Sequence, residues 1–135
     1  MKLAPATIDR LVAAAEAVRR NAHAPYSGFA VGAAVLAADG RLFTGCNVEN
    51  ASYGLSVCAE RNAIAAAVAS GVTRLAALAV VTAASPPATP CGACRQVILE
   101  FGALPVVCAN TDGERKILDS RELLPEAFLP GTLDG

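Results

Sequence analysis

Residues 29–47 read FAVGAAVLAADGRLFTGCN, and this stretch decides the fold predicted for the chain. Residues 29–36 form a short apolar run with the length of a buried strand, and residues 41–47 have the composition of a second strand. Asp39-Gly40 between them is typical of a two-residue hairpin turn, because glycine adopts positive φ without strain. The sequence therefore predicts an antiparallel hairpin with a two-residue turn.

Three helices are expected around this hairpin. Apolar residues recur every three or four positions over residues 7–21, and Thr7 has the hydroxyl that caps a helix start. An alanine-rich helix is predicted over residues 57–70 with Gly71 as its stop, and a third helix is expected to open at Pro90.

Strands are predicted between and after these helices, at residues 78–82, 105–109 and 117–118. Asp112-Gly113 is expected to turn the chain between the last two, and residues 121–124 to form one helical turn. Strands and helices that alternate after an opening hairpin predict a three-layer α/β/α sandwich around a mixed five-stranded sheet. At this length we expect one domain over residues 1–135.

Composition limits the function. Hydrophobic residues make up 54% of the chain, charged residues 17%, and the net charge is −1 without any run of Lys or Arg. A polynucleotide-binding protein needs a basic surface, so small-molecule substrates are favoured, and the apolar excess favours an oligomer. Five cysteines, an odd number, and no leader-like start over residues 1–4 predict a cytoplasmic protein with reduced thiols. No apolar run has membrane-spanning length.

Two cysteine motifs carry the candidate chemistry. Cys58-Ala59-Glu60 and Pro90-Cys91-Gly92-Ala93-Cys94 together offer three thiolates and one carboxylate. Catalytic zinc sites use three protein ligands and leave one tetrahedral corner for water. We therefore predict that Cys58, Cys91 and Cys94 bind Zn²⁺ and that Glu60 carries protons.

The predicted helices place these cysteines at helix N-termini, where free N–H groups and the helix dipole stabilise thiolates. Glu60 can reach the metal site only if Cys58 lies at the helix start, because residues i and i+2 do not share a helix face. Arg61 or Arg95 is expected to donate hydrogen bonds to the ligand sulfurs.

Two other interpretations remain open at this stage. A C-x-x-C pair such as Cys91 and Cys94 is also typical of redox sites. Cys46 or Cys108 can complete a closed, four-cysteine structural zinc site, although we prefer to interpret both as small buried apolar residues. His23, the only histidine, is expected at the surface.

The ordered motifs resemble the small, homotetrameric, zinc-dependent cytidine deaminases. The matching segments are residues 25–27, 29–34, 45–54, 58–61, 90–96 and 122–125. The zinc-deaminase signature pairs a ligand-x-Glu motif with Pro-Cys-x-x-Cys. Ala30 and His23 depart from the family pattern, where proline and tyrosine are common, and residues 128–135 match it only loosely.

This resemblance implies roles for individual residues. Cys58, Cys91 and Cys94 would hold one zinc ion per subunit, Glu60 would shuttle protons, and Arg61 would hydrogen-bond the ligand sulfurs. Phe29 would stack on the pyrimidine, Asn47 and Glu49 would hold the ribose hydroxyls, and Ala59 would line the substrate site. Tyr53 and Phe128 would complete the site of a neighbouring subunit.

The expected reaction is the hydrolytic deamination of cytidine and 2′-deoxycytidine to uridine and 2′-deoxyuridine in pyrimidine salvage. Deaminases of the blasticidin S type share the zinc site but lack a pair like Asn47 and Glu49. Deaminases of polynucleotides need basic grooves, which this composition does not supply.

Overall fold

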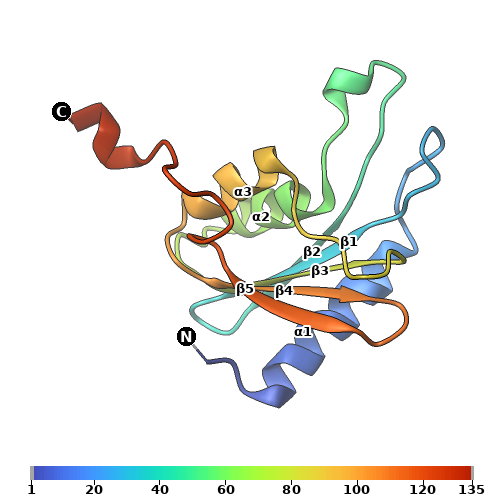
Figure 1. Cartoon of the computed structure of the whole chain (residues 1–135), viewed down its shortest axis with the longest axis horizontal. Helices are drawn as coiled ribbons and strands as arrows, with labels where there is room; N and C mark the ends of the chain where they lie inside the picture. Colours follow the sequence, from blue (N-terminus) through green and yellow to red (C-terminus); the bar gives the residue numbers. More distant parts are fainter. Residues whose placement is uncertain (1, 135) are drawn as a thin grey trace.

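A five-stranded mixed sheet lies between two helical layers (Figure 1). The computed structural model describes residues 2–134, so Met1 and Gly135 of the expected domain lie outside the described residues. The strand order is β2-β1-β3-β4-β5. The helices are α1 (Pro5–Arg19), α2 (Ala59–Ala69) and α3 (Gly92–Leu99), and the strands are β1 (Gly32–Ala37), β2 (Leu42–Cys46), β3 (Leu75–Thr82), β4 (Pro105–Asn110) and β5 (Arg115–Asp119). Two short 3₁₀ helices are η1 (Tyr53–Leu55) and η2 (Pro130–Asp134).

Helix α1 covers one face of the sheet, and α2 and α3 cover the other (Figure 1). All neighbouring strands are antiparallel except β3 and β4, which are parallel. The predicted three-layer sandwich around a mixed sheet is therefore confirmed. Within residues 2–134, no helix is both long enough and apolar enough to cross a bilayer.

The hairpin forms as predicted, but its first strand starts three residues later than the apolar run. Before Gly32, backbone groups bond to the side chain of Asn47 and not to a neighbouring strand. Val31 N donates to Asn47 Oδ1 at 2.9 Å, and Asn47 Nδ2 donates to Phe29 O at 2.8 Å. The predicted two-residue turn is also wrong. Ala37 N donates to Arg41 O and Gly40 N to Ala37 O, so the turn has three residues, and Gly40 takes φ +92°.

Helix α1 starts at Pro5 and not at Thr7. Ala4 is the N-cap residue and makes no side-chain capping bond, so the predicted role of Thr7 is wrong. Proline fits the first helical position because it has no N–H to leave unpaired and its φ is already helical. Residues 121–124 form hydrogen-bonded turns that are not continued into a helix.

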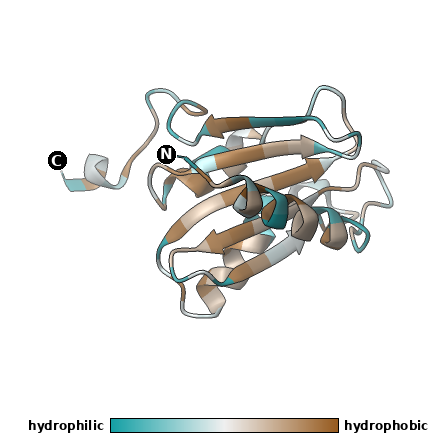
Figure 2. Ribbon diagram, turned by 90° about the horizontal axis from the view of Figure 1, so that it is seen from below, coloured by the Kyte–Doolittle hydropathy of each residue, from teal (hydrophilic) through white to brown (hydrophobic). Residues whose placement is uncertain are grey.

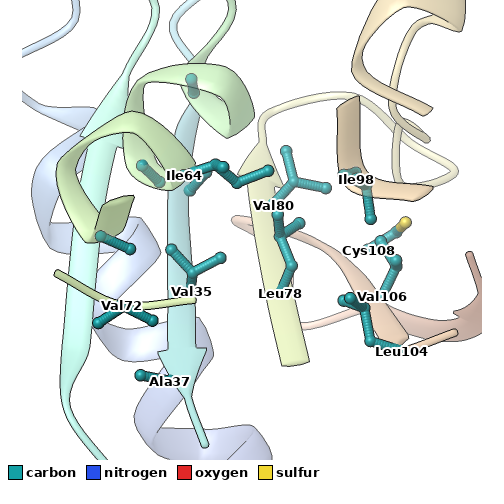
Figure 3. Packing of buried hydrophobic residues seen from close by; sticks show 14 residues of the cluster. Val35, Ala37, Ile64, Val72, Leu78, Val80, Ile98, Leu104, Val106 and Cys108 are labelled. Atoms are coloured by element: carbon teal, nitrogen blue, oxygen red, sulfur yellow. The ribbon is translucent and has the colours of Figure 1, made fainter. Parts of the chain in front are cut away.

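The core divides into two clusters, one on each face of the sheet. Between the sheet and α2–α3 lie residues such as Ile64, Leu78 and Ile98 (Figure 3), and α1 packs Leu11 and Ala15 on the other face. Strands β1, β3 and β4 are apolar along most of their length, whereas the edge strand β5 is largely hydrophilic (Figure 2). Continuous apolar strands with helices on both faces are typical of the parallel part of an α/β sheet.

A glycine allows α2 to lie against the sheet, backbone to backbone. A Cβ atom on Gly45 would lie 2.8 Å from Ala59 O and from the carbonyl carbon of Asn62, and closer still to Ala63 N. Asn62 Nδ2 also donates to Cys46 O at 2.8 Å. Strand β2 therefore fixes the position of the helix that carries Glu60.

Candidate metal centre and cleft

The N-termini of α2 and α3 position the three candidate ligands. Cys58 and Cys91 are the N-cap residues of these helices, with extended backbone at φ −70°, ψ 155° and φ −67°, ψ 167°. Cys94 lies in the first turn of α3 and is fully buried. The predicted helix-start geometry of Cys58 is thus confirmed. Because Cys58 precedes the helix, the i, i+2 spacing no longer separates it from Glu60.

The three sulfur atoms lie close enough to share one ion. All of them lie within 4.8 Å of one another, and Cys58 Sγ is 3.7 Å from Cys91 Sγ. In a tetrahedral site with Zn–S bonds of about 2.3 Å, neighbouring sulfurs are about 3.8 Å apart. The donor set and its spacing therefore fit zinc.

The remaining cysteines do not join this group. Cys46 lies half-buried on β2 and Cys108 is fully buried on β4. Over the described residues, the only cluster of potential metal ligands that contains a cysteine is Cys58, Cys91 and Cys94. The four-cysteine structural site is therefore not supported, and one tetrahedral position stays free of cysteine.

Hydrogen bonds among the cysteines and Arg61 favour a thiolate in the cluster. A hydrogen bond from Cys94, together with those from Arg61 and Cys91, lowers the pKa of Cys58 to about 5. The same bond and burial raise the pKa of Cys94. Arg61 Nη2 donates to Cys58 Sγ at 3.5 Å, which raises the pKa of Arg61. Zinc binding completes the deprotonation of such ligands.

Only one of the two candidate arginines bonds to sulfur. Arg61 makes the predicted hydrogen bond to the sulfur of Cys58. The guanidinium of Arg95 instead donates to three oxygen atoms, those of Thr89 Oγ1 and of the carbonyls of Pro90 and Leu123. The alternative that Arg95 bonds the sulfurs is therefore not supported.

Glu60 is a buried carboxylic acid beside the cysteines. Its side chain is 4% exposed and lines the same cleft as Cys58 and Cys91. Burial, followed by the charge of Cys58, raises the pKa of Glu60 above its usual value. A raised pKa makes the carboxyl group a better proton acceptor than an ordinary glutamate, which suits it to take up and return protons.

The cleft has a volume of about 290 Å³ and collects most of the predicted site residues. From the predicted set, it is lined by Phe29, Asn47, Glu49, Cys58, Ala59, Glu60 and Cys91. Phe29 is 43% exposed, so its ring is available to a ligand. An aromatic ring, polar side chains and a buried acid thus share one concave surface, which is typical of a small-molecule site.

Asn47 and Glu49 are held rigidly. Besides the two bonds of Asn47, Glu49 Oε1 accepts from Tyr26 N at 3.0 Å and from Ser27 N at 3.1 Å, and Glu49 Oε2 accepts from Ser27 Oγ. These bonds, first of all that from the Ser27 hydroxyl, lower the pKa of Glu49. A carboxylate has about four acceptor positions, so Oε2 can accept one more bond, and Asn47 keeps one free N–H.

Six further residues, for which no role was predicted, also line the cleft: Ser27, Val31, Val80, Thr82, Ala88 and Thr89. Thr82 ends the buried strand β3, and ligands in α/β proteins gather beyond the carboxyl ends of parallel strands. A polar residue at the end of an apolar strand was therefore a usable signal. Ala88 and Thr89 carry no comparable signal in the sequence.

Tyr53 and Phe128 lie outside this cleft. Tyr53 is 73% exposed and packs edge-on against Tyr26, with ring centroids 5.6 Å apart. Phe128 is 58% exposed on the segment that leads to the C-terminus, where its carbonyl accepts a bond from Gln96. His23 is exposed, as predicted.

Comparison with known proteins gives one consistent family. A family model described as "Cytidine and deoxycytidylate deaminase zinc-binding region" matches residues 5–110. The chain is 47% identical over 123 residues to a cytidine deaminase of Sporosarcina psychrophila, covering 90% of each chain. It is 50% identical over 108 residues to a cytidine deaminase of Mycobacterium tuberculosis, covering 80% of this chain and 79% of that one.

Solved structures agree with these relatives. The structure of cytidine deaminase from Burkholderia pseudomallei superposes with a TM-score of 0.86 at 51% identity, covering 89% of this chain and 98% of the other. The structure of cytidine deaminase from Mycobacterium leprae superposes with a TM-score of 0.76 at 45% identity, covering 87% of this chain and 97% of the other. A structure of a cytidine deaminase from Bacillus anthracis superposes with a TM-score of 0.72 at only 15% identity. That match shows a similar fold and nothing more.

Proposed function

Because the chain belongs to the cytidine deaminase family, we propose that it hydrolyses cytidine and 2′-deoxycytidine to uridine and 2′-deoxyuridine with release of ammonia. The enzyme is a hydrolase that acts on the C–N bond of a cyclic amidine and uses zinc as its cofactor. Residues 1–135 form its single catalytic domain.

One observation carries this proposal. The buried acid Glu60 lines one cleft together with Cys58, Cys91 and the exposed ring of Phe29. Zinc held by Cys58, Cys91 and Cys94 would supply a Lewis acid that lowers the pKa of a water molecule. A closed structural zinc site would need neither the acid nor the cleft.

Glu60 acts as the proton carrier in both halves of the reaction. It removes a proton from the attacking water and delivers it to N3 of the pyrimidine while the oxygen bonds to C4. It then takes the proton of the new hydroxyl group and gives it to the amino group. The C4–N bond breaks, ammonia leaves, and C4 keeps the oxygen as a carbonyl. Desolvation of Glu60 supports both transfers, because it raises the pKa of the acid above its usual value.

The rest of the cleft recognises the nucleoside. Phe29 offers a flat apolar surface for the base, and Ala59 leaves room beside it. Asn47 retains a free N–H and Glu49 a free acceptor position, which match the ribose hydroxyls as donor and acceptor. Because both side chains are already fixed by hydrogen bonds, little conformational entropy is lost on binding.

A substrate panel tests this function. Ammonia release and the ultraviolet change are followed for cytidine, 2′-deoxycytidine, blasticidin S and a cytosine-containing oligonucleotide, and only the two nucleosides are expected to react. Glu60→Gln should keep its zinc and lose about 10²–10⁴-fold in kcat, whereas Glu16→Gln, at an exposed position of α1, should retain full activity. A fully active Glu60→Gln enzyme, or preferential turnover of blasticidin S, would contradict the proposal.

We also propose a cytoplasmic homotetramer that serves pyrimidine salvage and shares its sites between subunits. Tyr53, Leu55 and Phe128 are large, exposed side chains on segments that project from the sandwich (Figure 1). Neither Tyr53 nor Phe128 lines the cleft of its own chain, so each is available to a second copy.

Mixed oligomers test this sharing. Glu60→Gln subunits keep Tyr53, and Tyr53→Ala subunits keep Glu60, so refolding the two together should restore activity that neither variant has alone. Light scattering should give the mass of four chains. A fully active monomer, or mixtures no more active than their components, would refute the shared site.

A further inference from the structure

Arg95 ties together three parts of the chain around the metal centre. Its Nε donates to Pro90 O at 2.7 Å, its Nη1 to Leu123 O at 2.8 Å, and its Nη2 to Thr89 Oγ1 at 2.9 Å. The side chain thus turns back from the first turn of α3 toward the residues that precede the helix. All three bonds are formed by a charged donor, which makes them stronger than neutral hydrogen bonds.

The bonded residues lead directly into the site. Thr89 lines the nucleoside cleft, and Pro90 is buried between Thr89 and the ligand Cys91. Proline has no N–H, so Pro90 can be fixed by backbone hydrogen bonding only through its carbonyl group. Arg95 donates a hydrogen bond to that carbonyl group. It thereby fixes Pro90, which connects Thr89 in the cleft wall to the metal ligand Cys91.

The third bond supplies an external support. Leu123 follows β5 in the chain and packs against the core cluster beneath α2 and α3. Through this carbonyl, the segment Thr89–Pro90 is attached to the body of the fold and not only to its own helix. A lysine would carry the same charge, but its single ammonium group does not reproduce the planar fork that reaches all three acceptors.

We propose that Arg95 is a positioning residue that sets both the Thr89 wall of the cleft and the Cys91 ligand. This inference rests on the proposed function, because it assumes that a nucleoside occupies the cleft and zinc the cysteine cluster. Arg95 acts through Thr89 and Pro90 and itself makes no bond to a cysteine sulfur in the described structure.

Three variants and one control test the proposal. Arg95→Lys loses the fork, Thr89→Val loses only the hydroxyl acceptor, and Thr89→Ser keeps that acceptor. Ser120→Ala is the control: Ser120 is buried, accepts from Leu104 N and donates to Gly102 O, both at 3.0 Å, and does not line the cleft. Each purified, zinc-loaded enzyme is measured well below its unfolding temperature.

We expect Arg95→Lys to raise the KM for cytidine and to speed zinc release to a chelator, each by about tenfold to a hundredfold, the range of one charge-assisted hydrogen bond. Thr89→Val should raise KM with little change in zinc release, and Thr89→Ser should restore KM. Ser120→Ala should lower the unfolding temperature and change neither quantity.

A purely structural Arg95 would give the same pattern as Ser120→Ala, a lower unfolding temperature with unchanged KM and zinc release, and that result would overturn the proposal. An unchanged KM in Thr89→Val would do the same even if Arg95→Lys failed to fold. If the unmodified enzyme did not deaminate cytidine, the proposed function would fail, whereas the zinc-release comparison would still test the link from Arg95 to Cys91.

Discussion

Replacing Gly45 with alanine should displace helix α2 and thereby reduce activity, although Gly45 itself does not line the cleft. The added Cβ would lie 2.8 Å from Ala59 O, where an ordinary contact begins at 3.4 Å, and it would lie closer still to Ala63 N. These atoms are helix backbone and cannot rotate away. Helix α2 must therefore withdraw from β2 by at least the 0.6 Å between the two values, and Glu60 moves with it.

The size of the effect follows from this displacement. Overpacking of this kind typically costs about 1–3 kcal/mol of the free energy of unfolding. A misplacement of about 1 Å in a catalytic group can reduce the rate by about 10²-fold. Gly45→Ala should therefore fold but lose roughly two orders of magnitude in kcat/KM. This loss of activity is larger than the loss that its lower stability alone would cause.

Denaturant unfolding, zinc content and kcat/KM for cytidine measure these effects separately. Ala13→Ser is the control, because Ala13 is exposed on α1, on the opposite face of the sheet from α2, and does not line the cleft. It should leave all three quantities unchanged. If Gly45→Ala kept the kcat/KM of the unmodified enzyme, the claim that β2 sets the position of Glu60 would be wrong.

Three further predictions concern the metal and the charged groups. Cys46→Ser and Cys108→Ser should each still bind one zinc per chain, because neither thiol belongs to the metal cluster; loss of zinc in either variant, measured by elemental analysis, would revive a fourth cysteine ligand. Removal of zinc by a chelator should lower the unfolding temperature and abolish turnover, since a ligand that binds only the native state stabilises it by about 2.7 kcal/mol at a hundred times its Kd; calorimetry with and without added zinc checks this, and equal transitions would argue against the site. Hydrogen bonds from Ser85 and Asn110 lower the pKa of Glu114 below its usual 4.5, so their stabilising effect is present above that pH and disappears as the pH falls through the lower, folded-state pKa. The stability difference between the unmodified enzyme and Glu114→Gln should therefore shrink in acid, and a difference that is constant from pH 7 to pH 3 would contradict this assignment.

The parts of the fold that local signals specify were predictable from the sequence. The glycine at position 40 marked the hairpin, and Gly71, at φ +89°, ended α2 as expected. The cysteine spacing identified the metal ligands because the N-cap positions of two helices are themselves local features. The proposed hydrolysis needs a proton carrier beside the metal, and Glu60 is the acid that follows Cys58 in the sequence.

Features that depend on distant residues were not predictable in this way. The apolar pattern extends strand β1 back to Phe29, but Asn47 takes the backbone bonds of Phe29 and Val31 and ends the ladder at Gly32. Periodicity also favoured Thr7 over Pro5 as the helix start, since the first turn of α1 is largely exposed and has little apolar pattern. Thr89 joins the cleft only through the tertiary path of the loop that precedes α3.

The two glycines of the hairpin also bear on how this enzyme tolerates mutation. Gly32 and Gly45 sit at adjacent rungs of the β1–β2 ladder, and each admits the backbone of a helix, α1 near Gly32 and α2 near Gly45. Where two main chains are in contact, no side chain can change its rotamer to make room for an added atom. Libraries that diversify the nucleoside pocket should therefore leave this pair of glycines intact, together with the metal ligands and Glu60, to preserve the alignment of both helical layers.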